Sequence, residues 1–253
     1  MLALKQLRCP RLDMEVLDLQ LHPGEHWALL GPNGSGKTTL LHTLAGLLPH
    51  DGLIQYQGKH LDHYTPLQRA QTLALLLQQA GAPTAWKVHE YLQVASRPPG
   101  CPGPSGALRT QVFSALDMEP LLERPVHHLS GGQWQRVQVA AVLLQDTPVI
   151  LLDEPLNHLD LRHQQRLMQL LDTLRVEGRL LLSSLHDINQ AFGRCTHAML
   201  FHPGCIEAGT AGALMVEEKL GPLYGLPLRK LTAQGRQWLL PADLPEAPKG
   251  ADR

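Results

Sequence analysis

The chain has 253 residues, of which 43% are hydrophobic, 18% charged and 4% aromatic, and 22 Lys and Arg balance 23 Asp and Glu. This composition excludes a disordered chain and predicts one large domain or two small ones with a real core. The balanced charge and the scarcity of aromatic residues argue against a nucleic-acid partner. The longest stretch without charge, residues 70–86, contains Gly81 and Pro83 and is shorter than the roughly 20 apolar residues of a membrane-spanning helix.

The N-terminal residues and the cysteines indicate a cytoplasmic protein. Residues 1–12 carry Lys5, Arg8 and Arg11 and lack the apolar segment and cleavage site of a signal peptide. The four cysteines are widely spaced without a CxxC pair, so we expect reduced thiols. The 14 histidines show no metal-binding spacing, and we interpret all but His186 as solvated or capping residues.

The sequence predicts strands that alternate with loops and helices along most of the chain. Leucines alternate with polar residues over 17–21, a turn follows at 22–25, and we expect a hairpin to open the protein. An apolar strand at 27–30 then leads through a glycine-rich loop into a helix from 37 to about 47. Further strands are expected at 53–56, 73–77, 149–152, 180–184 and 198–201, and a helix at 161–176. Strands that alternate with helices predict a parallel α/β sheet whose ligands bind at the carboxyl ends of the strands.

A helical segment interrupts this pattern between about residues 81 and 145. Its Pro/Gly cluster at 97–106 predicts an exposed loop. We interpret the segment as an inserted subdomain rather than a linker between domains, because the strand pattern resumes only after 147. Beyond 209 we expect a short helix, a hairpin of 228–231 with 237–240, and a frayed tail over 241–253. The prediction is one domain with a core (1–80 and 147–210), a helical subdomain (81–146) and a C-terminal extension (211–253).

The glycine-rich loop, Gly31 to Thr38, fits GxxxxGK[ST] between a strand and a helix. Its glycines let the backbone curl around phosphate, and its N–H groups and the helix N-terminus supply partial positive charge. Lys37 is expected to reach the β- and γ-phosphates, and the Thr38 hydroxyl to bind Mg²⁺. The predicted nucleotide-binding residues here are Asn33, Gly34, Ser35, Gly36, Lys37, Thr38 and Thr39.

Two carboxylates, Asp153 and Glu154, follow the apolar strand 149–152 and should lie at the ligand edge of the sheet beside this loop. Asp153 is expected to hold Mg²⁺, mainly through water. Glu154 is expected to orient or deprotonate the attacking water, which is what phosphoryl transfer needs beyond positioning and charge neutralisation. Together with the loop, the pair predicts a P-loop nucleoside triphosphatase.

A second anion site is predicted at Ser130-Gly131-Gly132-Gln133, which opens a helical run. Ser130 has the position of a helix N-cap, and the two glycines let a ligand approach the N–H groups of the first turn. With the phosphate loop before it and Asp153 after it, this segment resembles the signature of the ATP-binding cassette (ABC) family.

The resemblance implies a P-loop (RecA-like) α/β core with an antiparallel β subdomain and an inserted helical subdomain. Gln78, with Gln79 as second choice, resembles the glutamine that senses the γ-phosphate and Mg²⁺. Asp160 resembles the residue of the loop that links the two ATP sites across a dimer of such chains. His186 resembles the switch histidine that contacts the γ-phosphate. The family pairs two chains head to tail, so ATP and Mg²⁺ on one protomer are covered by the signature residues of the other. One departure is that residues 1–26 lack the usual aromatic residue for adenine. Arg11 is a candidate substitute, with a surface-exposed arginine as the favoured alternative, and base selectivity is expected to be loose.

A closer resemblance lies in residues 129–137, with the unusual Trp134, and in 151–157 and 183–189. These are similar to ATP-binding subunits of importers for iron-siderophores, haem and cobalamin, and most similar to those for vitamin B12. The resemblance implies a separate integral-membrane permease dimer, an indirect periplasmic substrate-binding partner and a place on the cytoplasmic face of the bacterial inner membrane. The alternatives are an importer of iron-siderophore or haem, an exporter subunit and a soluble regulator. A DNA-repair cassette would need a long coiled-coil insertion, a translation-type protein normally has two P-loops, and a non-enzymatic module would have lost Lys37, Glu154 or His186.

Overall fold

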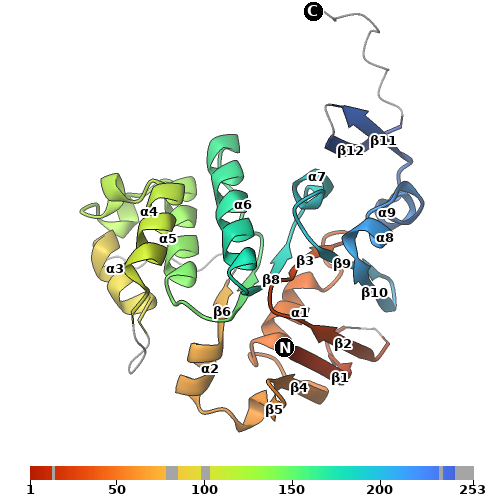
Figure 1. Ribbon diagram of the computed structural model, residues 1–253, viewed down its shortest axis with the longest axis horizontal. Coiled ribbons are helices and arrows are strands. Elements are labelled where there is room, and N and C mark those ends of the chain that lie inside the picture. The colour runs from red at the N-terminus through yellow and green to blue at the C-terminus, as the bar shows by residue number, and fades with distance from the viewer. Residues whose placement is uncertain (13–14, 78–84, 98–102, 234–235, 243–253) are drawn as a thin grey trace, which may run out of the picture.

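The structure is a computed structural model, which describes residues 1–12, 15–77, 85–97, 103–233 and 236–242. The α-helices are α1 (Lys37–Leu44), α2 (Pro66–Thr72), α3 (Val88–Ala95), α4 (Gly106–Leu116), α5 (Gly131–Leu143), α6 (Leu161–Val176), α7 (Ile188–Ala191), α8 (Ala211–Leu214) and α9 (Glu217–Tyr224). The strands are β1 (Leu2–Arg8), β2 (Leu17–Leu21), β3 (His26–Leu30), β4 (Asp51–Tyr56), β5 (Lys59–His60), β6 (Leu73–Leu76), β7 (Val149–Leu152), β8 (Leu180–Ser184), β9 (His197–His202), β10 (Cys205–Thr210), β11 (Leu228–Ala233) and β12 (Arg236–Pro241). Figure 1 shows their arrangement.

The central sheet has the strand order β10-β9-β3-β8-β7-β6, and all neighbouring pairs except β10 with β9 are parallel. β3, β7 and β8 are buried along their whole length, as expected for parallel strands covered on both faces. The expected strands at 149–152 and 180–184 and the helix at 161–176 are confirmed residue for residue, whereas the helix expected to run to about 47 ends at Leu44.

A second sheet, β2-β1-β4-β5, is antiparallel. The hairpin expected around the turn at 22–25 is not formed, because this turn leads from β2 into β3 of the other sheet; β2 pairs instead with β1, a strand that the sequence did not predict. The central sheet lies between two hydrophobic clusters. Trp27 and Leu29 pack with α1 and the antiparallel sheet, whereas Ala28 and Leu30 pack with α5, α6 and the C-terminal helices. These layers confirm the predicted fold class of an α/β core with an antiparallel β subdomain and helical additions.

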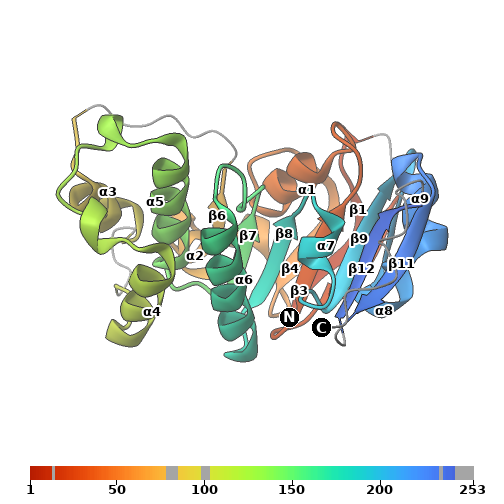
Figure 2. The same cartoon turned by 90° about the horizontal axis from the view of Figure 1, so that it is seen from above.

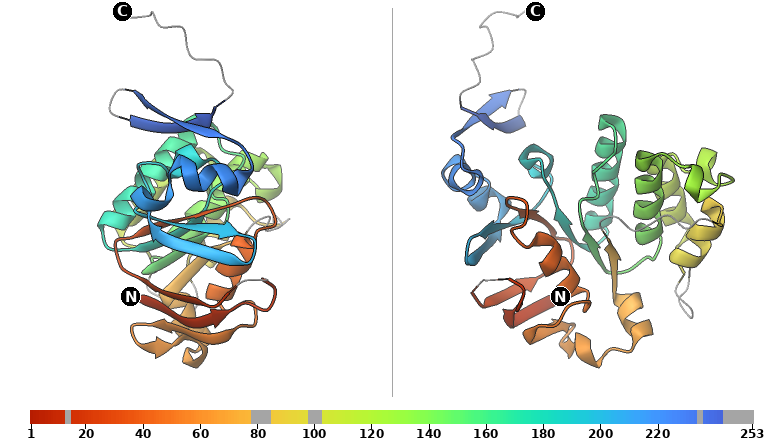
Figure 3. Two further views of the ribbon diagram at one scale, coloured as in Figure 1. Left: turned by 90° about the vertical axis from the view of Figure 1, so that its right-hand side faces the viewer. Right: turned by 180° about the vertical axis from the view of Figure 1, so that it is seen from behind.

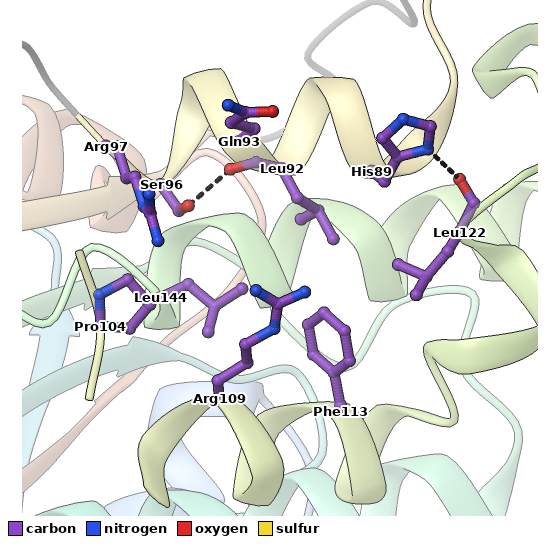
Figure 4. Close-up of a pocket in the computed structure, with 10 residues that line it drawn as sticks. All are labelled: His89, Leu92, Gln93, Ser96, Arg97, Pro104, Arg109, Phe113, Leu122 and Leu144. Atoms are coloured by element: carbon purple, nitrogen blue, oxygen red, sulfur yellow. Dashed lines mark hydrogen bonds between the residues drawn. The ribbon is translucent and has the colours of Figure 1, made fainter. Parts of the chain in front are cut away.

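The described part of 85–145 contains helices and no strand, with α5 packed against α3 and α4. Figure 2 places this helical arm at one end of the molecule. In Figure 4, Leu92 of α3 and Phe113 of α4 face each other across a cavity of about 300 Å³, and Arg109 lies 4.9 Å from the Phe113 ring centroid. Of the loop expected at 97–106, residues 98–102 lie outside the described part, and α4 already begins at Gly106.

The C-terminal residues form a hairpin, as expected: β11 pairs antiparallel with β12, with Leu231 opposite Trp238. Figures 1 and 3 show α8, α9 and this hairpin at the end of the molecule opposite the helical arm. The expected frayed tail falls almost entirely on residues 243–253, outside the described part. Among the described residues, no helix is long and apolar enough to span a membrane, no three His, Cys, Asp or Glu side chains are grouped so that they could hold a metal ion, and Cys9, Cys195 and Cys205 are free.

Candidate active site

The glycine-rich loop connects β3 to α1 at the carboxyl edge of the central sheet. Gly36 is the N-cap of α1 with φ of 101°, a left-handed conformation that favours glycine, and no side chain caps the helix. The N–H groups of the first turn therefore have no side-chain acceptor, which suits them to bind an anion. A Cβ at Gly36 would lie 2.1 Å from Cδ2 of Leu12, so this loop is covered by a residue of the β1–β2 connection.

Lys37 is buried within the loop that precedes it. Its Nζ donates to the carbonyl oxygens of Gly31, at 2.7 Å, and Pro32, at 2.9 Å. Burial lowers the pKa of the Lys37 ammonium, while the negative charges of Glu154 and Asp153 oppose this shift. The Lys37 side chain is thus held beside the two carboxylates predicted to act with it.

Asp153 follows β7 and is 2% exposed. Its Oδ1 accepts a hydrogen bond from Oγ of Ser184 at 2.6 Å, and the same Ser184 oxygen accepts from the backbone N–H of Glu154 at 2.8 Å. Oδ2 of Asp153 is buried and has no hydrogen-bond partner among the described residues. A buried carboxylate oxygen without a donor is costly unless a cation meets it. Because Thr38, a residue with a hydroxyl group, also lines the adjoining cleft, the residues present fit a magnesium ion.

Glu154 is fixed by contacts of its side chain and of its backbone. Its Oε1 lies 2.6 Å from Nε2 of His186, Asn157 Nδ2 donates to its Oε2, and its carbonyl oxygen accepts from Gln135 Nε2 at 3.3 Å. With its backbone N–H bonded to Ser184, the residue adopts φ of 51°, an uncommon left-handed conformation for a non-glycine residue. These contacts hold the Glu154 carboxylate in one orientation beside His186.

A cleft of about 400 Å³ unites the loop with these catalytic candidates. It is lined by Asn33, Gly34, Gly36, Lys37, Thr38, Thr39, Glu154 and His186. Ser35 lies partly buried in the same loop, and the buried Asp153, directly before Glu154 in the chain, does not line the cleft. Gln78 and Gln79, predicted to contact the γ-phosphate and Mg²⁺, lie outside the described residues.

The signature residues form a separate group that does not line this cleft. Ser130 caps α5 as expected: its Oγ accepts from the Gln133 N–H at 3.3 Å, and Gln133 Oε1 accepts from the Ser130 N–H at 3.0 Å. Arg124 also donates to Oε1 of Gln133, at 3.1 Å. Gly131 faces open space, whereas a Cβ at Gly132 would lie 2.5 Å from the carbonyl oxygen of His158.

Asp160 lies close to the signature in the chain segment that follows Glu154. It is the N-cap of α6, and its Oδ1 accepts from the His163 N–H at 2.8 Å. This backbone hydrogen bond, with a further bond from the His163 ring, holds the pKa of the Asp160 carboxyl below its usual value. Since Gly132 packs against His158, the loop that contains Asp160 adjoins the signature within one protomer.

Sequence reasoning missed several residues that shape the site. Ser184 orients Asp153 and Glu154, Asn157 orients Glu154, and Leu12 covers the loop at Gly36. Ser184 had a readable signal, because it is a polar residue at the end of an apolar strand. Leu12 had none, since its contact depends on how the β1–β2 connection folds over the loop. Arg11 is exposed, which is the alternative that the sequence favoured over a role as substitute for an aromatic residue.

Comparisons with known proteins all match ABC transporter proteins. The ABC transporter family profile matches residues 14–157. The vitamin B12 import ATP-binding protein BtuD of Escherichia coli is 34% identical over 229 residues, which cover 87% of this chain and 90% of the relative. BtuD of Shigella boydii matches to the same extent.

Solved structures with the same fold include the ATP-binding subunit of an ABC transporter, with a TM-score of 0.77 at 24% identity, covering 89% of this chain and 98% of that one. A metal-chelate type ABC transporter in an inward-facing conformation has a TM-score of 0.77 at 24% identity, over 95% and 96% of the two chains. The dimeric structure of a bacterial ABC transporter cassette has a TM-score of 0.70 at 25% identity, over 83% and 98%.

Proposed function

Because the chain belongs to the ABC transporter family, we propose that it is the ATP-hydrolysing subunit of an importer whose cargo is vitamin B12. The observation that carries the ATPase proposal is the cleft in which Lys37, Glu154 and His186 face one space. It combines a phosphate-binding helix start and a buried ammonium with a fixed carboxylate, which are the groups that phosphoryl transfer to water requires.

In this proposal each residue of the cleft has a separate role in ATP hydrolysis. The loop N–H groups and Lys37 bind the β- and γ-phosphates of ATP. Glu154 accepts a proton from the attacking water, and His186, 2.6 Å away, holds the Glu154 carboxylate and contacts the γ-phosphate. Thr38 and Asp153, with Gln78 as the third predicted ligand, would hold Mg²⁺, which supplies charge neutralisation when bound.

A second copy of the chain is expected to complete the site. The signature lies outside the cleft of its own protomer, and its glycines and Ser130 open a helix whose N-terminus favours anions. A relative of the same fold is a dimeric cassette. We therefore expect a head-to-tail dimer in which Ser130, Gly131, Gly132 and Gln133 of one protomer cover ATP bound to the other, with Asp160 linking the two sites.

The permease partner is expected to dock on an apolar groove of about 460 Å³ between the end of α1, α2 and the end of β6. Leu47 and Leu77 on this groove are 58% and 41% exposed, which is unusual for large aliphatic side chains grouped together. Docking here would place the protein on the cytoplasmic face of the inner membrane, with the periplasmic substrate-binding protein as an indirect partner.

Replacement of Glu154 by Gln tests the ATPase proposal. Loss of the general base should lower steady-state hydrolysis by about 10²- to 10⁴-fold, while an ATP-bound dimer accumulates in light-scattering measurements. Undiminished turnover would remove Glu154 as the base. A wild-type chain that binds ATP without hydrolysing it, alone or with its permease, would overturn the proposed function.

The cargo is tested with reconstituted transporter rather than with the isolated chain. ATPase activity should rise when the periplasmic protein is loaded with cobalamin and should not rise with a ferric siderophore or haem. Stimulation by one of the iron ligands alone would transfer the proposal to that importer class. Stimulation without any periplasmic protein would favour an exporter.

The groove is tested by Leu47→Glu and Leu77→Glu. Each should abolish co-purification with the permease while leaving ATP binding by the isolated chain unchanged. Val176→Glu is the matched control, because Val176 is a 75% exposed aliphatic residue at the end of α6, away from the groove. Equal loss of the permease in all three variants would contradict this surface.

A further inference from the structure

The C-terminal extension reaches the first residue of the phosphate loop. Tyr224, the last residue of α9, accepts a hydrogen bond through its hydroxyl oxygen from the backbone N–H of Gly31 at 3.1 Å, across 193 positions of the chain. Gly31 is buried, and a buried backbone N–H needs an acceptor. The Tyr224 hydroxyl thus supplies the acceptor at the point where β3 becomes the loop.

The same extension also holds the segment that carries His186. Asn189 lies in α7, directly after His186 and the N-cap Asp187. Its Nδ2 donates to the carbonyl oxygen of Leu239 at 3.0 Å, and its Oδ1 accepts from the Leu239 N–H at 2.8 Å. One side chain therefore makes both backbone hydrogen bonds to β12, which fixes α7 to the hairpin in position and orientation.

The two contacts converge on one region. Burial raises the pKa of the Tyr224 hydroxyl, the Gly31 hydrogen bond opposes this shift, and the negative charge of Asp187 adds to it. Tyr224 thus contacts the phosphate loop, and α7, which follows His186 and Asp187, is bonded to β12 of the same extension. Figure 1 shows α7 beside β12, with α9 below the hairpin.

Apolar side chains also attach the extension to the core. Leu220 and Leu223 of α9 and Leu239 of β12 are buried in the main hydrophobic cluster, which supplies the docking energy. The polar contacts fall on the two segments whose positions set the shape of the ATP cleft. The buried leucines therefore anchor the extension to the core, and the polar contacts position the two segments of the ATP cleft.

We propose that the extension is a brace of the ATP site, in which Tyr224 positions the phosphate loop and Asn189 positions the His186 segment. The inference rests on the proposed ATP hydrolysis. Since the loop binds phosphate, loss of the Tyr224 hydroxyl acts on ATP affinity. Since His186 contacts the catalytic carboxylate, loss of the Asn189 amide acts on turnover.

Steady-state ATPase kinetics of the full chain test the brace. Tyr224→Phe should raise KM for ATP about fivefold with kcat within twofold, and Asn189→Ala should lower kcat about fivefold with KM within twofold. Tyr56→Phe is the control, because the Tyr56 hydroxyl accepts only a 3.4 Å hydrogen bond from its neighbour Gln57. If Asn189→Ala does not fold, Asn189→Asp, which keeps the acceptor for the Leu239 N–H, takes its place with a smaller expected loss of kcat.

Two outcomes overturn the brace. One is wild-type KM and kcat in both variants. The other is equal loss of active protein together with a lowered unfolding temperature, without a split between KM and kcat, as a purely structural role would give. Absence of hydrolysis in the wild-type chain would instead refute the proposed function, so the two failures are distinguishable.

Discussion

Two helix N-termini in this molecule are expected to meet phosphate, and they differ in how their N–H groups are satisfied. α1 begins at Gly36 without any side-chain cap. α5 begins at Ser130 with a reciprocal capping box to Gln133, which Arg124 supports. α1 therefore presents N–H groups without any side-chain acceptor to a ligand, whereas in α5 the N–H groups of Ser130 and Gln133 already have side-chain acceptors before a ligand arrives.

Because of this difference, we expect the N-terminus of α1 to contribute to ATP binding and the N-terminus of α5 to contribute to dimerisation. Binding of ATP to the isolated chain should depend on α1 and Lys37, because the first-turn N–H groups of α1 have no side-chain acceptor and the Lys37 ammonium adds positive charge beside them. The capped end of α5 is preformed, so substitutions there should act on the meeting of two protomers rather than on ATP binding by one.

The largest effect that this comparison predicts is for Lys37→Ala. Loss of a buried cation opposite phosphate should weaken ATP binding by about 2 to 5 kcal/mol, which is about 30-fold or more. In wild-type protein, ATP at about 100 times its Kd should stabilise the fold by about 2.7 kcal/mol. Thermal unfolding with and without ATP measures this gain, which the variant should lose; a retained gain would contradict the role of α1 and Lys37.

The residues of this comparison also show what the sequence can predict. α6 and the Ser130 cap depend on local spacing, so both were readable from neighbouring residues. The contact of Tyr224 with Gly31 and the two hydrogen bonds of Asn189 with Leu239 join segments far apart in the chain. Nothing in local periodicity encodes such contacts, because they arise only when the extension folds back onto the core.

A smaller effect, confined to dimerisation, is predicted for Ser130→Asp. Aspartate is as good an N-cap as serine, so the unfolding temperature should stay within a few degrees of wild type. Its charge should repel the γ-phosphate of the partner's ATP and prevent the ATP-bound dimer, measured by light scattering in a Glu154→Gln background. ATP binding by the monomer should persist.

Ser105→Asp is the matched control for this substitution. Ser105 caps α4 in the same way, with its Oγ accepting from the Leu108 N–H at 3.1 Å. It should leave the dimer intact. Equal loss of dimer in both variants, or loss of ATP binding by the Ser130→Asp monomer, would show that the capped end of α5 does not act between protomers.

Substitutions of the two glycines at the start of α5, Gly131 and Gly132, should have opposite effects on the stability of the fold. A Cβ at Gly132 would lie 2.5 Å from the His158 carbonyl oxygen, so Gly132→Ala should destabilise the fold by about 1 to 3 kcal/mol. Gly131 faces open space, and Gly131→Ala should stabilise it by about 0.4 to 1 kcal/mol. Urea unfolding of both variants measures the difference. Similar midpoints would mean that the preformed end of α5 does not depend on its contact with His158.

A further effect concerns acid and the strand that leads into the phosphate loop. His26 at the start of β3 is fully buried beside Ser183, with its Nε2 2.9 Å from Ser183 Oγ. Burial, and to a lesser extent the charge of Arg175, lowers the pKa of His26 from 6.5 to about 3. Between these values the unfolded chain binds a proton that the folded chain does not, so stability is full above pH 6.5 and falls as the pH drops towards 3.

From pH 7.5 to 5.5 the expected loss from His26 is about 1.4 kcal/mol, since one pKa unit corresponds to about 1.36 kcal/mol. Denaturant unfolding at both pH values measures it, and His26→Gln, which cannot titrate, should show a pH dependence smaller by this amount. Hydrogen exchange should locate the loss in β3 and the phosphate loop more than in α5. An identical pH dependence in the two proteins would mean that His26 titrates alike in the folded and unfolded chains. Acid would then not destabilise β3 and the phosphate loop more than it destabilises α5.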